Sequence, residues 1–212
     1  MTGSLEAIDV LIEPRGLEGI LHLPRRPIGL IIFAHGSGSS RFSPRNMFVA
    51  RELASRGFAA LLFDLLTSEE AQDRRNVFDI PLLSSRVGEA VDWAPTSSYV
   101  HRLPIGLFGA STGAAAALVA AAHEPGRVKA VVSRGGRPDL AGEALPRVKA
   151  PTLLIVGGLD DEVLELNRRA LTLLQCEKRL DVVPGATHLF EEPGTLEAVV
   201  AASIGWFAAH VP

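Results

Sequence analysis

A serine stands between two glycines in the stretch Gly109-Ala110-Ser111-Thr112-Gly113, directly after an apolar run and directly before a run of alanines. This is the G-x-S-x-G pattern of a nucleophile elbow, a tight strand-to-helix turn that exposes the serine hydroxyl. A serine hydroxyl is a weak nucleophile until a neighbouring base accepts its proton. The stretch therefore predicts Ser111 as a nucleophile, and the alternative is a turn that only requires small residues.

A histidine and an aspartate complete the set of groups that such a nucleophile needs. His188 lies in an expected loop after the last strand-like run, and we predict it as the general base. Asp160 follows two glycines at the end of another apolar run, and we predict it as the acid that orients the imidazole. Its neighbour Asp161 is a rival, whose other role would be to begin the next helix. Activity is then expected to rise with pH as His188 loses its proton.

Backbone N–H groups could stabilise the oxyanion that forms when the serine attacks a carbonyl. The N–H of Thr112, directly after the nucleophile, is the first candidate. The second is the N–H of Ser37, in the small-residue loop that runs from His35 to Ser40. We expect His35 to hold this loop by a hydrogen bond, and the other histidines to lie at the surface or at helix ends: His22, His101, His123 and His210.

Two arginines are candidate substrate-binding residues at the same edge of the fold. Arg41 and Arg134 follow apolar runs, and guanidinium groups match carboxylates and phosphates in geometry. The alternative is that they hold loops in place through carboxylates such as Asp139. Asp64 ends another apolar run, and we expect it to orient a nearby loop.

The order of the elements predicts how these residues meet. Two alternating stretches, 6–13 and 17–23, predict an antiparallel hairpin at one edge of a sheet. Short continuous apolar runs are typical of parallel strands that are covered on both faces. Such runs occur at 29–34, 59–64, 104–109, 129–133 and 152–157, and 179–185 would be a last strand.

Helical segments alternate with these strands. Ser43-Pro44 is a helix start signal and Gly57 a stop signal, and further helices are expected at 83–94, 112–123, 162–175 and 195–209. The alternation predicts a three-layer α/β sandwich with a mostly parallel sheet, formed as a single domain over residues 1–212. Ser111, Asp160 and His188 then all lie at strand ends on one edge of the sheet, where open α/β folds build their sites.

Composition excludes several classes of partner. The 212 residues carry a formal net charge of −3, so no electrostatic attraction to nucleic acid or an anionic membrane is expected. Cys176 is the only cysteine, and no histidine spacing indicates a metal site, so we predict neither metal nor cofactor. The loop HGSGSS lacks the G-x-G-x-x-G pattern of a dinucleotide site. The N-terminal stretch MTGSLEAIDV lacks a leader pattern, which favours a cytoplasmic location.

Six blocks of the sequence, from about residue 15 to the C-terminus, resemble one known family. They are IIFAHGSGSSRFSPRN, GFAALLFDLLT, GASTGAAAAL, SRGGRPDL, LLIVGGLDDEVL and GATHLFEEPG. The chain resembles the dienelactone-hydrolase-like branch of the α/β-hydrolases, which implies an eight-stranded sheet and a triad of Ser111, Asp160 and His188. Dienelactone hydrolases use a cysteine nucleophile, and this chain has serine there. The resemblance therefore implies a small carboxylesterase, and the dienelactone substrate does not carry over.

The segment RGGRPDLAGEALPRVKA is too short to form the cap domain that many α/β-hydrolases insert at this point. We expect an open, shallow site with little apolar wall, suited to short acyl groups. The sequence predicts a serine hydrolase of small carboxylic esters or thioesters, whose partner is a small-molecule ester. The alternative is a non-catalytic protein of the same fold that binds a ligand or a partner.

Overall fold

Eight strands form one continuous sheet in the computed structural model, which describes residues 5–212. Residues 1–4 of the N-terminal stretch lie outside the described residues. The strand order is β1-β2-β4-β3-β5-β6-β7-β8. The strands are β1 (Glu6–Ile12), β2 (Leu17–Leu23), β3 (Gly29–Ala34), β4 (Phe58–Phe63), β5 (Ile105–Ala110), β6 (Val128–Arg134), β7 (Thr152–Gly157) and β8 (Lys178–Val183).

The sheet is parallel except at its N-terminal edge. The β1–β2 and β2–β4 pairs are antiparallel, and every other neighbouring pair is parallel. All residues of β3, β4, β5 and β7 are buried, as expected for central strands that are covered on both faces. The predicted strands and the antiparallel edge are thus confirmed, with end positions that differ by a few residues at most.

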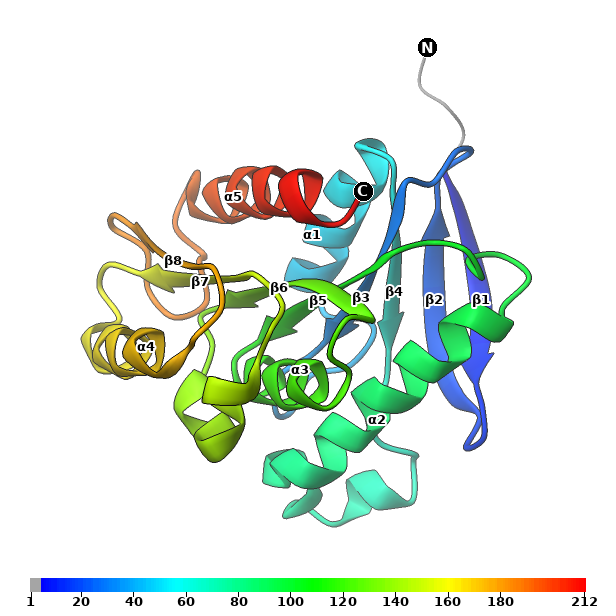
Figure 1. Ribbon diagram of the computed structural model, residues 1–212, viewed down its shortest axis with the longest axis horizontal. Coiled ribbons are helices and arrows are strands. Elements are labelled where there is room, and N and C mark those ends of the chain that lie inside the picture. The colour runs from blue at the N-terminus through cyan, green and yellow to red at the C-terminus, as the bar shows by residue number, and fades with distance from the viewer. Residues whose placement is uncertain (1–4) are drawn as a thin grey trace.

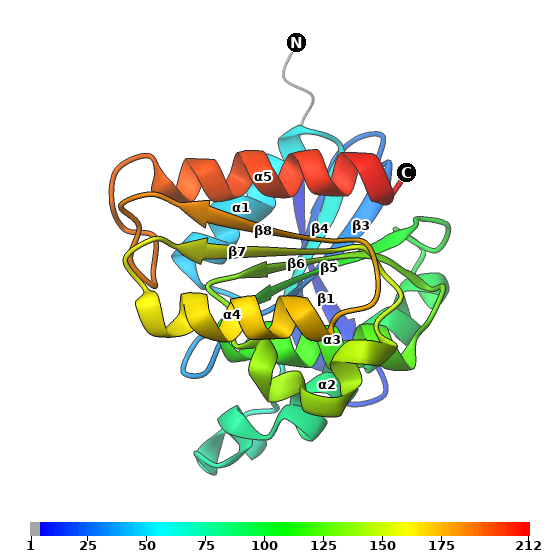
Figure 2. The same ribbon diagram turned by 60° about the vertical axis from the view of Figure 1, so that its left-hand side comes forward.

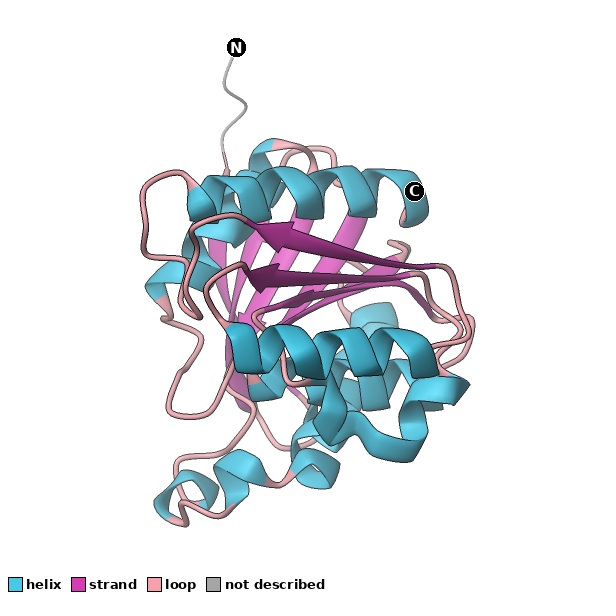
Figure 3. Ribbon diagram, turned by 90° about the vertical axis from the view of Figure 1, so that its left-hand side faces the viewer, coloured by secondary structure: helices cyan, strands magenta, loops and turns pink. Residues whose placement is uncertain are grey.

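Helices cover both faces of the sheet (Figures 1 and 2). Helices α1 (Pro44–Ser55) and α5 (Thr195–His210) lie on one face. Helices α2 (Ile80–Trp93), α3 (Thr112–His123) and α4 (Asp161–Leu173) lie on the other. Figure 3 shows the sheet edge-on between the two helical layers, which confirms the three-layer α/β sandwich.

Two of these helices begin at recognisable sequence signals. The Ser43 side chain caps α1 by accepting the Asn46 N–H, and Pro44 is the first helical residue, as predicted. Helix α2 begins three residues earlier than predicted. The carboxylate of Asp79 caps it by accepting the Leu82 N–H at 2.9 Å, and Pro81 lies in the first turn, so the same signal of a cap followed by proline was present here and was overlooked.

Small residues allow α3 to start directly against the sheet. A Cβ at Gly113 would collide with the carbonyl oxygens of Ala34 and His35, and a Cβ at Gly109 would collide with the backbone of Ala114. The alanines at positions 114–117 are fully buried. The two glycines of the G-x-S-x-G stretch are therefore needed for close backbone packing. This packing places the N-terminus of α3 against the C-terminal ends of β3 and β5.

Two connections shape the edge of the sheet where the parallel strands end. The β6–β7 connection forms a short helical segment, η4 (Pro138–Arg147), which packs against α3 and α4, and residues 5–212 contain no inserted cap domain. The β4–α2 connection forms two short turns, η1 (Glu70–Gln72) and η2 (Asn76–Phe78). Within the described part of the chain, no helix has the length and apolar character needed to cross a membrane.

Candidate active site

Ser111 occupies a strained turn between β5 and α3. Its backbone angles are φ 51° and ψ −123°, a left-handed conformation that costs a non-glycine residue about 1–3 kcal/mol. Its N–H donates to the carbonyl of Arg134 at 3.3 Å, and its own carbonyl accepts the N–H groups of Ala114 and Arg137. Three backbone hydrogen bonds, two to the stretch at the end of β6 and one within the first turn of α3, therefore hold the strained residue in place.

His188 and Asp160 meet although 28 positions separate them in the sequence. Nδ1 of His188 lies 2.6 Å from Oδ2 of Asp160, a distance typical of a charge-assisted hydrogen bond. The Asp160 side chain is 15% exposed and that of His188 is 38% exposed, so the acid is sheltered and the ring reaches solvent. Asp161 is the first residue of α4, but the cap position that the alternative gave it belongs to Asp160, whose side chain forms no capping hydrogen bond.

Ser111 and His188 line the same pocket, which has a volume of about 280 Å³. The segment Arg134–Gly135 lies next to both residues. The Arg134 carbonyl accepts the Ser111 N–H, and a Cβ built on Gly135 would lie 3.8 Å from Cε1 of His188. Ser37 also lines this pocket. The structure thus brings together the predicted nucleophile, base and acid.

The two predicted oxyanion donors lie beside Ser111, but only one of the two N–H groups already donates a hydrogen bond. Thr112 is the first residue of α3, so its N–H has no partner within the helix. The N–H of Ser37 donates to Oγ1 of Thr112 at 2.9 Å. Ser37 can therefore serve an oxyanion only if its N–H leaves the threonine hydroxyl, a constraint that the sequence does not reveal.

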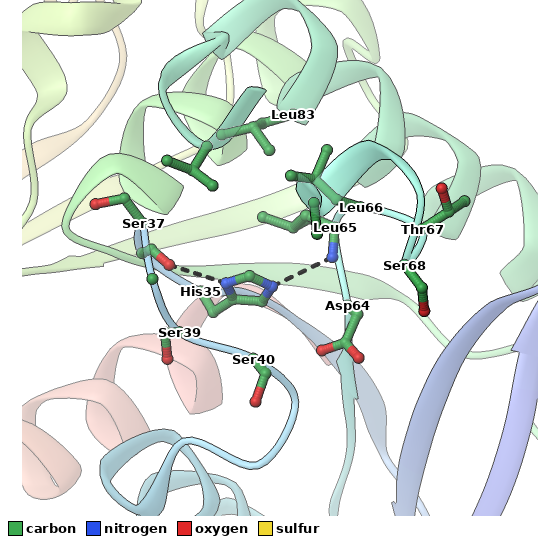
Figure 4. Close-up of a pocket in the computed structure, with 14 residues that line it drawn as sticks. His35, Ser37, Ser39, Ser40, Asp64, Leu65, Leu66, Thr67, Ser68 and Leu83 are labelled. Carbon is green, nitrogen blue, oxygen red and sulfur yellow. Dashed lines mark hydrogen bonds between the residues drawn. The ribbon is translucent and has the colours of Figure 1, made fainter. Parts of the chain in front are cut away.

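His35 ties the Ser37 loop to the end of β4 (Figure 4). Its Nδ1 lies 2.9 Å from the carbonyl of Gly36, and its Nε2 accepts the N–H of Leu65 at 3.2 Å. Burial in the first place lowers the pKa of His35, against smaller opposite effects of the Gly36 hydrogen bond and the Asp64 charge. The ring is thus a neutral structural bridge, as predicted.

The two candidate arginines have different surroundings. Arg41 forms an ion pair with Glu18 at 2.7 Å and a second with Asp64, which also accepts the Arg41 N–H. Arg41 therefore fits the loop-holding alternative, and Asp64 orients the loop as expected. Arg134 is 5% exposed, and its Nη2 donates to Oδ1 of Asn46 at 2.8 Å.

A neighbouring pocket corrects the expectation of a site with little apolar wall. This pocket of about 370 Å³ shares Gly36, Ser37 and Ser39 with the pocket of Ser111. Apolar side chains of the β4–α2 connection and α2 form its wall: Leu65, Leu66, Ala71, Val77 and Leu83. The expectation failed because it considered only a cap as the source of an apolar wall, and here the wall comes from the β4–α2 connection and α2.

A second correction concerns His22. It lies in β2 and is 4% exposed, not at the surface. Burial, and then the positive charge of Arg51, lower its pKa. Within residues 5–212, no three histidine, cysteine or acidic side chains gather in a way that could hold a metal ion.

The sandwich and the serine on its strand-to-helix turn define an α/β-hydrolase. The chain belongs to the dienelactone hydrolase family, whose model matches residues 17–208. It is similar to a dienelactone hydrolase of known crystal structure from Anabaena variabilis, with 51% identity, a TM-score of 0.95 and full coverage of both chains. Est1E from Butyrivibrio proteoclasticus shares the fold at 19% identity, with a TM-score of 0.79 over 97% of this chain and 98% of that one.

Curated relatives carry a different name. Two proteins from strains of Mycobacterium tuberculosis, each named "Putative phosphoribosyl transferase", are 57% identical over 206 residues. The match covers 97% of this chain and 46% of theirs. The chain thus spans about half the length of these relatives.

Proposed function

We propose that this chain is a serine hydrolase that cleaves small carboxylic esters or thioesters through an acyl-enzyme on Ser111. Membership of the dienelactone hydrolase family supports a hydrolytic activity. The observation that carries the proposal is the 2.6 Å contact between His188 and Asp160 at the pocket that holds the strained Ser111. A histidine that is held by a sheltered acid beside a serine is the arrangement that activates a hydroxyl.

The reaction follows from these positions. Oγ of Ser111 attacks the ester carbonyl carbon while Nε2 of His188 accepts the hydroxyl proton, and Asp160 stabilises the resulting imidazolium through Nδ1–H. When the tetrahedral intermediate collapses, the bond to the leaving alcohol or thiol breaks and His188 returns the proton to it. Water then attacks the acyl group on Ser111 with His188 again as base, which releases the acid.

The oxyanion of the intermediate is stabilised by the Thr112 N–H, together with the positive end of α3. The Ser37 N–H joins it by exchanging the Thr112 hydroxyl for the oxyanion. Each such donor contributes about 2.7–4 kcal/mol to transition-state stabilisation. The pocket walled by Leu65, Leu66 and Val77 is the place for a small apolar group of the substrate, because it adjoins Ser37.

We propose that residues 1–212 form one catalytic domain, because the eight strands form a single sheet and the helices pack on its two faces. The activity in the name of the curated relatives would then belong to the part of those proteins that this chain does not match. A serine, histidine and aspartate at one sheet edge support acyl transfer rather than phosphoribosyl transfer.

Hydrolysis of 4-nitrophenyl esters by the wild-type chain and by Ser111→Ala tests the proposal. We expect kcat to fall by a factor of about 10⁶ in the variant, because the triad acts as a unit. Ser85→Ala, on the exposed side of α2, is the matched control and should retain full activity. Ligand binding without turnover, or turnover that survives Ser111→Ala, would favour the non-catalytic alternative or another site.

Adjacent aspartates test the acid separately. Asp160→Asn should lower kcat about 10⁴-fold, because the amide favours the wrong histidine tautomer. Asp161→Asn, one position further on at the start of α4, should leave kcat nearly unchanged. An equal loss in both variants would mean that the effect lies in the fold of α4 and not in the His188 contact.

A further inference from the structure

Arg134 is a buried cation that has no anionic partner in the described part of the chain. Its side chain is 5% exposed, and within residues 5–212 it forms no ion pair with a carboxylate. Nη2 donates to the neutral Asn46, and Nε is buried with no hydrogen-bond partner. A buried charge is normally paired, because desolvating an unpaired ion costs several kcal/mol. Arg134 is one of the residues that line the pocket of Ser111 and His188.

Its surroundings make the region more positive still. Arg45 lines the same pocket, and its Nε is also buried without a partner. Arg45 stands in the first turn of α1, which contains no acidic residue, so a cation lies at the positive end of the helix dipole. Burial, and then the charge of Arg45, lower the pKa of Arg134 to about 10, which leaves the group protonated at neutral pH.

The acidic groups near the pocket do not neutralise this charge. Glu191 contacts Nη1 of Arg45 at 3.1 Å, but its side chain is 64% exposed and it forms no contact with Arg134. Asp160 is engaged by His188. The pocket is thus lined by the predicted nucleophile, by two arginines and by the first turn of α1. A negatively charged group bound there would give the buried guanidinium of Arg134 the partner that it lacks.

We propose that the substrate of this chain carries an anionic oxyacid group, a carboxylate or a phosphate, which Arg134 binds beside Ser111 with Arg45 at the same pocket. The proposal rests on the proposed function, because it names the substrate class of that site. Arg134 then discriminates charged from neutral esters and takes no part in the proton transfers. Asn46 positions the guanidinium by fixing one of its two terminal nitrogens.

A pair of esters tests the charge preference. The substrates are 4-nitrophenyl hydrogen glutarate, whose acyl group ends in a carboxylate, and 4-nitrophenyl pentanoate, which is neutral and of similar length. We expect kcat/KM of the wild-type chain to be at least about 10-fold higher for the glutarate ester. Arg134→Met should reduce this ratio about 10- to 100-fold, mainly by lowering kcat/KM for the charged ester.

Two further variants separate charge from structure. Arg134→Lys should recover part of the ratio, because it restores the charge without the planar fork. Arg75→Met, which removes an exposed guanidinium paired with Asp73, should leave the ratio unchanged. Equal kcat/KM values for the two esters in the wild type, or a ratio that Arg134→Met does not change, would overturn the proposal.

Inhibition distinguishes the two sources of the anion. Glutarate and inorganic phosphate are tested as competitive inhibitors of pentanoate ester hydrolysis at millimolar concentration. Stronger inhibition by glutarate indicates a carboxylate, and stronger inhibition by phosphate indicates a phosphate. Inhibition by neither anion overturns the proposal. If Arg134→Met does not fold, Arg45→Gln should weaken this inhibition, and unchanged inhibition counts against the site.

The anion site can be measured even if the chain hydrolyses neither ester. Calorimetric titration of the wild-type chain with glutarate and with phosphate should show binding that Arg134→Met or Arg45→Gln weakens. Binding without hydrolysis would leave the anion site standing and reject the proposed function. Hydrolysis of the neutral ester without anion binding would do the reverse.

Discussion

Two arginines of this chain are almost equally buried but differ in the charge of their partners. The Arg86 side chain, in α2, is 3% exposed and forms ion pairs with Glu70 and, at 2.9 Å, with Glu89. Arg134, at the end of β6, is 5% exposed and contacts the neutral Asn46. The first joins a helix to the connection that precedes it, and the second faces the candidate active site.

The fold supplies carboxylate partners for the charge of Arg86 and only a neutral amide for the charge of Arg134. Two carboxylates repay much of the desolvation of Arg86, so its role is accounted for by the folded chain alone. Nothing within residues 5–212 does the same for Arg134. Unbalanced ionisable groups gather at functional sites, because the missing partner arrives with the substrate.

Removing Arg86 should have the largest effect on stability. Arg86→Met leaves the partly buried Glu70 without its partner and Glu89 with Arg15 alone, which should lower the free energy of unfolding by about 3 kcal/mol. Urea denaturation followed by circular dichroism measures this loss. Arg75→Met removes an exposed arginine and should leave the denaturation midpoint unchanged. A midpoint of Arg86→Met equal to that of the wild type would mean that its ion pairs contribute nothing to folding.

Removing Arg134 should affect stability less. Arg134→Met loses one hydrogen bond to Asn46 but also removes a desolvated charge, so we expect a change within about 1 kcal/mol of the wild type. The same denaturation experiment compares the two variants directly. If Arg134→Met is destabilised as strongly as Arg86→Met, then Arg134 is structural and the contrast between them disappears.

Replacing His35 should have the smallest effect on stability. Unlike the two arginines, this buried group is neutral, because burial lowers its pKa. The pKa of His35 is below 6.5 in the folded state, so the unfolded chain binds a proton first as the pH falls. Stability should therefore decrease as the pH falls below 6.5 towards the lower folded value. Glutamine at this position can still accept the Leu65 N–H but cannot titrate.

The His35→Gln variant should accordingly show a weaker loss of stability in acid. His22, whose pKa burial also lowers, is present in both proteins and cancels in the comparison. Denaturation midpoints measured from neutral pH down into the acid range give the two slopes. Parallel slopes for the wild type and the variant would show that His35 does not couple folding to protons.

The sequence was sufficient for the parts of the site that local patterns determine. Ser111 lies in a motif whose glycines are required by close backbone contacts. Asp160 follows the buried strand β7 and His188 follows the edge strand β8, which pairs with β7 in parallel. Parallel topology then dictates that these residues converge. The convergence of these residues could therefore be predicted for the same reason as the fold.

The remaining features depend on which side chains meet across long stretches of sequence. Arg134 and Asn46 are 88 positions apart, and the carboxylates that engage Arg41 come from β2 and from the end of β4. No local pattern distinguishes Arg41 from Arg134. The apolar wall was missed for a similar reason, since Leu65, Leu66 and Val77 lie in a connection and line a pocket with Ser37 only in the folded chain.

Covalent labelling with a small neutral fluorophosphonate tests the central claim, an activated Ser111, most directly. Intact mass and peptide mapping should show one adduct on Ser111, absent in Ser111→Ala and formed much more slowly in His188→Ala. Arg134→Met should be labelled at the wild-type rate, because the probe carries no negative charge. The absence of an adduct on the folded chain, or an adduct on another residue, would contradict the account.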